Sequence, residues 1–153
     1  MAIAYDPLTA ELQVRLLDPS ARAPRRAHEH DAGFDLSCLE DFTLWPGRRR
    51  TVSTGVAIAL PAGVAGLITP RSGLASRNGV TIVNAPGLID PGYRGELRVV
   101  LLNTGEAPYA ARSGDRIAQL LLVPYVAPEI HVVDELPAAP DDRGELGYGS
   151  SGR

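Results

Sequence analysis

The sequence predicts an all-β protein, built as a sandwich or a barrel. Thirteen prolines and sixteen glycines recur at short spacing among the 153 residues. Between them lie brief runs rich in Val, Ile and Leu, which is the pattern of short strands joined by turns. The length suits one hydrophobic core, so we expect residues 1–153 to form a single domain.

Each predicted strand is a short apolar or β-branched run bounded by turn-forming residues. One short helix is predicted at 72–78, where Ser72 can cap the N-terminus and Gly79 suits the left-handed position after the last turn. After Leu136 the composition changes to Pro, Ala and Asp, then to Gly and Ser, so residues 137–153 are expected to form a mobile C-terminal arm. The predicted strands cover residues 12–17, 34–37, 42–44, 49–58, 65–69, 81–83, 96–102, 116–124 and 130–133.

The composition excludes several classes of function. A net charge of −3 with 22% charged residues is not the balance of a nucleic-acid binder. The single cysteine, Cys38, cannot form an internal disulfide, and no apolar run approaches the roughly 18 residues of a membrane span. We therefore expect a cytoplasmic protein with neither nucleic acid nor membrane as a partner. All fifteen basic residues are arginine, so an anion site must use Arg or backbone groups.

Residues 84–97 combine a carboxylate, an aromatic ring and two Pro/Gly pairs on a predicted hairpin. Asp90 and Tyr93 bracket Pro91-Gly92, which fits the centre of a type II turn with a positive φ at Gly92. The segment is either a site that displays Asp90 and Tyr93 beside a rigid bend or an ordinary turn with a solvated Asp.

A second candidate site lies at the start of the predicted helix. Free backbone N–H groups at a helix N-terminus attract anions, Gly73 allows close approach, Ser72 offers a hydroxyl, and Arg71 offers a charged fork. This pattern indicates a phosphate site, or else a plain helix cap with a surface arginine.

Two polar side chains interrupt predicted buried strands. Asp35 follows Gly33-Phe34, and it either faces solvent or helps to hold hydrated Mg²⁺ against phosphates. Gln119 lies within the apolar run at 116–124, where its amide either satisfies loop backbone or donates to a ligand oxygen.

The C-terminal residues combine flexible backbone with polar and aromatic groups. Arg143, Tyr148, Ser150 and Ser151 stand among glycines, Gly149 included. These are the parts of a lid that closes on a phosphorylated aromatic ligand, although a Gly/Ser terminus is also typical of a disordered end.

Taken together, five segments resemble the motifs of the trimeric dUTPase family, the deoxyuridine 5′-triphosphate nucleotidohydrolases, and stand in the same order. They are residues 32–36 (AGFDL), 70–75 (PRSGLA), 87–97 with Asn84 ahead of them, 114–120 (GDRIAQL) and 143–152 (RGELGYGSSG). The resemblance implies a jelly-roll-like distorted β-barrel of the dUTPase-like (β-clip) type, assembled as a homotrimer with shared active sites. It also implies Mg²⁺-dependent hydrolysis of dUTP to dUMP and pyrophosphate, which keeps uracil out of DNA and supplies dUMP for thymidylate synthesis.

The resemblance also implies roles for individual residues. Asp90 would activate the water that attacks the α-phosphorus, and Tyr93 would lie under the deoxyribose and leave no room for a 2′-hydroxyl. Asn84 and the hairpin backbone, Gly87 included, would read uracil. The phosphates would be held by Arg71, Ser72, Gly73, Gln119, Arg143, Gly149, Ser150 and Ser151, with Tyr148 stacked on uracil and Asp35 bound to the Mg²⁺ water shell.

The tail departs from the family pattern at three positions. Leu146 stands where glycine is usual, Tyr148 where phenylalanine is usual, and Ser151 where threonine is usual. The last two conserve a ring and a hydroxyl, whereas Leu146 removes a glycine that favours positive φ.

Two other functions are considered beside the hydrolase. A dCTP deaminase, or the bifunctional deaminase that continues to dUMP, shares a similar hairpin but carries a catalytic glutamate in the following strand, where this chain has Val100. A non-catalytic nucleotide sensor would use the same pocket and tail, but the presence of Asp90 argues against it.

Overall fold

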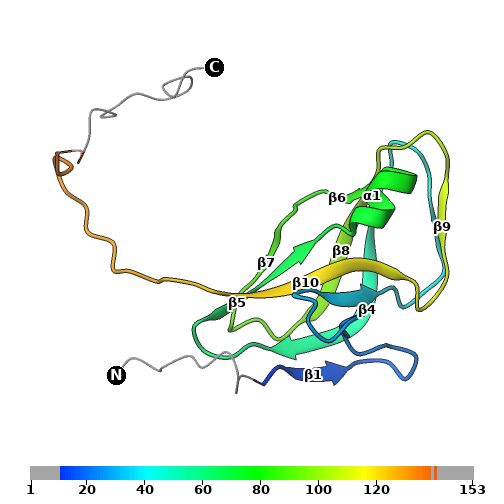
Figure 1. Cartoon of the computed structure of the whole chain (residues 1–153), viewed down its shortest axis with the longest axis horizontal. Coiled ribbons are helices and arrows are strands. Elements are labelled where there is room, and N and C mark those ends of the chain that lie inside the picture. The colour runs from blue at the N-terminus through cyan, green and yellow to red at the C-terminus, as the bar shows by residue number, and fades with distance from the viewer. Residues whose placement is uncertain (1–10, 139, 141–153) are drawn as a thin grey trace.

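The computed structural model describes residues 11–138 and 140. Their backbone is mostly strand with one short helix, which confirms the all-β class. Among these residues the strands form three sheets and no closed barrel (Figure 1). The elements are β1 Gln13–Leu16, β2 Phe34–Ser37, β3 Phe42–Leu44, β4 Arg49–Ala59, β5 Val64–Thr69, α1 Ser72–Asn78, β6 Val80–Ile82, β7 Gly87–Ile89, β8 Glu96–Asn103, β9 Tyr109–Ala111 and β10 Arg116–Pro124.

Two four-stranded sheets share the apolar core. One has the order β1-β4-β8-β6 and the other β2-β10-β5-β7, and β3 pairs with β9 in a small third sheet. Every pairing is antiparallel. Buried side chains of both large sheets belong to a single cluster, and each fully buried Leu or Val contributes about 1.5–3 kcal/mol.

Strand β8 shows how the sequence pattern builds this core. Leu97, Val99, Leu101 and Asn103 are buried, and the residues between them are partly or fully exposed, as the period of two in a strand requires. The alternation therefore points one face of β8 into the core and leaves the other accessible.

Asn103 is a buried polar residue at the end of this alternation, with no exposed surface. Its Nδ2 donates to the carbonyls of Leu44 and Ala107 at 2.8 and 2.9 Å, and its Oδ1 accepts from the Gly105 amide at 2.8 Å. The side chain thus joins β3, β8 and the loop that leads to β9. A buried amide is tolerated here because its donors and acceptor are paired.

Cys38 follows β2 and lies in the same core, with only 2% of its surface exposed. Its Sγ lies 3.0 Å from the carbonyl oxygen of Arg112. Burial raises the pKa of the thiol, so the neutral S–H form is favoured.

The predicted elements differ from the observed ones in several places. The strands β7 and β9 are additional, and each has only three residues, too few for a clear pattern. The predicted strand at 130–133 is wrong: this segment pairs with no strand among residues 11–138 and runs away from the sheets (Figure 1). Ser72 is not the N-cap either. Arg71 takes that place with extended dihedrals and no side-chain cap, whereas Gly79 has the expected positive φ of 65°.

None of the helical structure in the described part of the chain is long and apolar enough to cross a membrane.

Replacing Asn103 with Ala should lower the free energy of unfolding by about 3 kcal/mol, since each buried group left without a partner costs about 1–3 kcal/mol. Urea denaturation would measure this. The matched control is Asn78→Ala at an exposed position, which should change stability by no more than about 0.5 kcal/mol. Equal effects of the two substitutions would show that the buried amide does not stabilise this junction.

Candidate active site

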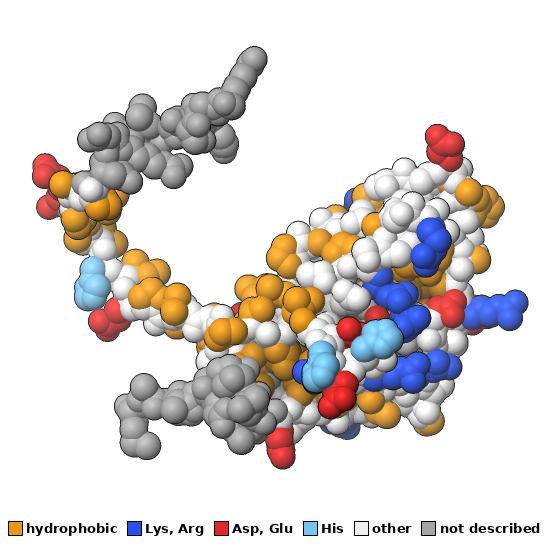
Figure 2. Space-filling model, in the orientation of Figure 1, with side chains coloured by type: hydrophobic (Ala, Val, Ile, Leu, Met, Phe, Trp, Pro, Cys, Tyr) orange, Lys and Arg blue, Asp and Glu red, His pale blue; other side chains and the backbone are white. Residues whose placement is uncertain are grey.

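A pocket of about 390 Å³ brings together three of the predicted site residues. Asp35 of β2, Gln119 of β10 and Arg71 before α1 all line it. Strand pairing explains this, because Gln119 lies opposite Asp35 on one side and opposite Thr69, two residues before Arg71, on the other. In Figure 2 basic side chains gather over the part of the molecule where β2 and β10 lie, with acidic atoms among them.

Asp35 is buried, with 7% of its surface exposed, so the solvent-facing alternative for it is wrong. Its Oδ2 accepts a hydrogen bond from Arg116 Nη1 at 3.0 Å. Its Oδ1 lies 3.2 Å from Arg71 Nε without hydrogen-bond geometry, and both atoms are buried with no hydrogen-bond partner among the described residues. Two guanidinium groups thus face this buried carboxylate, and a second carboxylate, Asp31, also lines the pocket. The guanidinium N–H groups at the pocket wall are donors suited to an anionic ligand.

Arg116 is a pocket residue that reasoning from sequence did not single out for this role. Besides its bond to Asp35, its carbonyl accepts from Arg71 Nη1 at 3.0 Å. Asp35, to which Arg116 donates, is 81 positions away in the sequence. Only the β2–β10 pairing, which places Arg116 opposite Ser37, could have revealed the contact.

Gln119 lines the pocket beside Gly33, and α1 begins directly after the pocket residue Arg71. A Cβ built on Gly33 would lie 3.5 Å from the Gln119 side chain, an ordinary contact distance, so Gly33 packs directly beside the amide. Gly73 lies beneath the guanidinium of Arg77, since a Cβ at this glycine would lie 2.9 Å from Nη2. The neighbourhood of Arg71, Ser72 and Gly73 therefore includes a further basic side chain.

The predicted β-hairpin is wrong, because β7 pairs with β5 whereas β8 pairs with β4 and β6, so the strands before and after the bend lie in different sheets. Residues 84–97, which keep the name hairpin for their bend, also form a different turn from the expected one. The Tyr93 amide donates to the Asp90 carbonyl at 3.0 Å, which closes a four-residue turn. Gly92 does not have a positive φ, so the predicted type II turn is wrong, and a type I geometry suits Asp at the first position and Pro at the second. Arg94 Nη1 donates to the carbonyls of Pro91 and Tyr93 at 2.6 and 2.8 Å and holds the bend.

The hairpin also brings Asn84 against Gly87. A Cβ on this glycine would lie 3.4 Å from Asn84 Nδ2 and 3.5 Å from Ile68 Cβ, which are ordinary contact distances, so Gly87 lies next to both the Asn84 amide and β5. Asn84 and Asp90 are exposed, whereas Gly87 is buried. The exposed side chains of Asn84 and Asp90 thus stand on either side of Gly87 in the sequence, and the Gly87 backbone is paired with Ile68 of β5.

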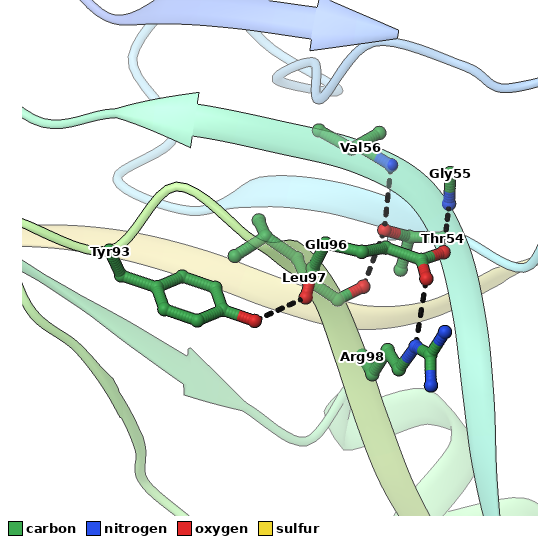
Figure 3. A network of polar contacts seen from close by, with 7 residues as sticks. All are labelled: Thr54, Gly55, Val56, Tyr93, Glu96, Leu97 and Arg98. Atoms are coloured by element: carbon green, nitrogen blue, oxygen red, sulfur yellow. Dashed lines mark hydrogen bonds and ion pairs between the residues drawn. The ribbon is translucent and has the colours of Figure 1, made fainter. Parts of the chain in front are cut away.

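The ring of Tyr93 is 44% exposed, and its hydroxyl donates to the Glu96 carbonyl at 2.9 Å (Figure 3). Burial raises the pKa of the Glu96 carboxyl, but hydrogen bonds from Arg98 and from the Gly55 amide lower it further than burial raises it. The result is a pKa below the ordinary value, so Glu96 is charged at neutral pH.

The candidate residues form two groups in one chain. The first is Asp35, Arg71, Ser72, Gly73 and Gln119, and the second is Asn84, Gly87, Asp90 and Tyr93 on the hairpin. No hairpin residue lines the 390 Å³ pocket. Arg143, Tyr148, Gly149, Ser150 and Ser151 lie outside the described residues, as does Leu146.

Comparison with known proteins gives consistent matches. A family model described as dUTPase matches residues 20–152. The chain is 52% identical to a deoxyuridine 5′-triphosphate nucleotidohydrolase of Thermobifida fusca over 145 residues, covering 94% of this chain and 80% of that relative. It is 51% identical to the enzyme of the same name from Mycobacterium bovis, covering 95% and 97%.

Solved structures match as well. A mutant of Staphylococcus bacteriophage 80alpha dUTPase with dUpNHpp is 35% identical with a TM-score of 0.87, over 95% of this chain and 100% of that one. A mutant dUTPase from phage phi11 of S. aureus, whose structure is described as revealing the coordination of a structural Mg(II) ion, is 34% identical with a TM-score of 0.77. It covers 82% of this chain and 97% of its own.

Proposed function

The chain belongs to the dUTPase family and is a hydrolase that acts on dUTP, and we propose that the two residue groups described above form its active site. The products would be dUMP and pyrophosphate, and the role in a cytoplasmic setting would be to keep uracil out of DNA and to supply dUMP for thymidylate synthesis. The observation that carries the assignment is the placement of Arg71, Arg116 and Gln119 around the buried Asp35.

The first group would bind the triphosphate. Arg71 and Gln119 would donate to phosphate oxygens, together with Ser72 and the backbone at Gly73. The presence of two guanidinium groups, Arg71 and Arg116, in the pocket lining supports this role. Arg143, Gly149, Ser150 and Ser151 would add donors at the γ end, and Tyr148 would stack on the base.

The hairpin group would read the nucleoside and supply the base for catalysis. Asn84 and the backbone at Gly87 would hydrogen-bond to uracil, and an imperfect match to cytosine would leave polar groups unpaired. Tyr93 would lie against the deoxyribose. Asp90 is exposed at the bend, where it can accept a proton from the water that attacks the α-phosphorus.

Mg²⁺ is implied by the family, and the residues here fit an ion held mainly by the substrate. Asp35 Oδ1 is buried without a hydrogen-bond partner among the described residues, so it can accept from a water of the ion's shell. No three His, Cys, Asp or Glu side chains within the described ranges cluster to hold a metal. When bound, the ion supplies neutralisation of phosphate charge.

We propose a homotrimer in which each active site combines groups from different copies. The separation of the pocket from the hairpin supports this arrangement. So does the segment after β10, which leaves the body of the molecule (Figure 1) with Val126, Ile130 and Val132 at least 90% exposed. Apolar side chains this exposed are typical of an interaction surface.

The two rival functions are not favoured. Val100 stands in β8, half-buried and opposite Thr51, and an apolar side chain there cannot shuttle the protons that deamination needs. The relatives above are named as hydrolases of deoxyuridine triphosphate, and a sensor without turnover would not need Asp90.

A substrate panel tests the proposed reaction. With Mg²⁺, pyrophosphate should be released from dUTP, with far less from dCTP, dTTP and UTP, and chelation by EDTA should stop the release. Ammonia should be assayed in the same samples. Ammonia from dCTP would identify a deaminase, and tight dUTP binding without pyrophosphate would identify a sensor.

Asp90→Asn tests the role of the carboxylate. The variant should lose kcat by about 10²–10⁴-fold, the usual contribution of a general base, and should retain substrate affinity because the pocket is unchanged. Steady-state kinetics would measure the loss of kcat, and equilibrium binding of a non-hydrolysable dUTP analogue would measure the affinity. Weak binding with little loss of kcat would contradict the assignment.

Mixed assemblies test the sharing of sites. Asp90→Asn and Arg71→Ala should each be nearly inactive, but refolding them together should recover activity, because some sites then combine an intact hairpin with an intact pocket. Light scattering should give about three times the 16.2 kDa chain mass. The control pair, Asp90→Asn with Tyr93→Ala, has both defects on the hairpin and should recover nothing. Equal behaviour of the two mixtures would exclude shared sites.

A further inference from the structure

The Tyr93 ring is held by two contacts at the base of its own hairpin. Its hydroxyl donates to the Glu96 carbonyl at 2.9 Å, and the ring passes over Gly95 (Figure 3). A Cβ on Gly95 would lie 2.4 Å from the Tyr93 hydroxyl oxygen and 2.6 Å from Cζ, so the ring needs glycine at this position. Because the ring is 44% exposed, packing constrains it little, and these contacts decide its orientation.

Glu96 is in turn fixed by its side chain, of which only 16% is exposed. Oε1 accepts from the Gly55 amide at 2.9 Å, and Oε2 accepts from Arg98 Nε at 2.8 Å. The carboxylate therefore connects the start of β8 with the middle of β4. Any shift of the Glu96 backbone would stretch one of these charge-assisted hydrogen bonds.

The Gly55 amide needs this partner because β4 is irregular at that point. Between the pairs Ser53–Arg98 and Ala57–Glu96, β4 advances four residues and β8 only two. Gly55 lies inside this bulge with a φ of 69°. Its N–H is thus out of the regular ladder, and the Glu96 carboxylate takes the place of the missing strand partner.

The neighbouring contacts make the bulge stiff. Thr54 Oγ1 donates to the Leu97 carbonyl at 2.6 Å and accepts from the Val56 amide at 3.3 Å (Figure 3). The Gly55 carbonyl accepts from the Leu17 amide at 2.8 Å. The bulge in β4 that binds the Glu96 carboxylate is therefore held by contacts to β8 and to Leu17, the residue after β1.

We propose that Glu96 is a positioning residue that sets the angle of the Tyr93 ring and thereby the preference for 2′-deoxyribose over ribose. This inference rests on the proposed function, in which Tyr93 lies against the sugar. Exclusion of one hydroxyl group depends on the position of the excluding surface. If the carboxylate is lost, the Glu96 carbonyl and the ring bonded to it are released, and space opens for the 2′-hydroxyl.

The test compares two selectivity ratios in the full-length protein. For Glu96→Ala, the ratio of kcat/KM for dUTP to that for UTP should fall by about tenfold or more, within the range by which pockets reject one small group. The ratio for dUTP to dCTP should change by less than about twofold, because Asn84 and Gly87 remain in place. Glu96→Gln keeps an acceptor for the Gly55 amide and should restore most of the sugar selectivity.

The exposed Glu106 supplies the matched control, and Glu106→Ala should leave both ratios unchanged. Tyr93→Phe removes the hydroxyl that reaches Glu96 and should also lower the dUTP/UTP ratio. If Glu96→Ala does not fold, as judged by circular dichroism and thermal melting, Tyr93→Phe tests the inference. An unchanged dUTP/UTP ratio in Tyr93→Phe would then overturn the inference.

Two other outcomes are decisive. An equal fall of both ratios in folded Glu96→Ala would show a general structural role and overturn the inference. Failure of the unmodified protein to hydrolyse dUTP would instead contradict the proposed function itself, which keeps the two failures distinct.

Discussion

The buried carboxylate of Asp35 is the contact around which the candidate phosphate pocket is organised. It connects β2 with the start of β10 through Arg116 and with the β5–α1 junction through Arg71. A charge in this environment is tolerated only with partners, and removal of either partner would leave the other charges uncompensated. The same requirement that stabilises the arrangement brings two guanidinium groups to the pocket wall, so the interaction that holds the strands together also supplies donors for an anion.

The hairpin follows a different principle. Its chemical groups are exposed, and their positions come from backbone contacts: the closed turn at Asp90, the Arg94 guanidinium over the bend and the Tyr93 hydroxyl on the Glu96 carbonyl. The pocket is thus held together by a buried carboxylate, and the hairpin by paired backbone donors and acceptors. A site that combines both can select by charge in one half and by shape in the other.

Much of the fold was accessible from sequence, because short alternating runs and turn residues are local signals. The strand β8 and the glycine after α1 follow directly from them. The partners of Asp35 were not accessible, since they depend on pairing across 81 positions. The role of Glu96 depends on a bulge in another strand, and a local pattern cannot show which segment lacks a ladder partner. The apolar, β-branched run at 130–133 was misleading for the same reason, because a strand requires a neighbour that this segment does not have within the described part of its own chain.

The buried thiol of Cys38 has a practical consequence for following motions of the protein. Alkylating reagents attack the thiolate, and both the raised pKa and the 2% exposure suppress that reaction in the folded state. This is the only cysteine in the chain, so alkylation reports opening of the core just after β2, the strand that carries Asp35. The rate of labelling would therefore measure local unfolding at this end of β2, with no engineered probe required.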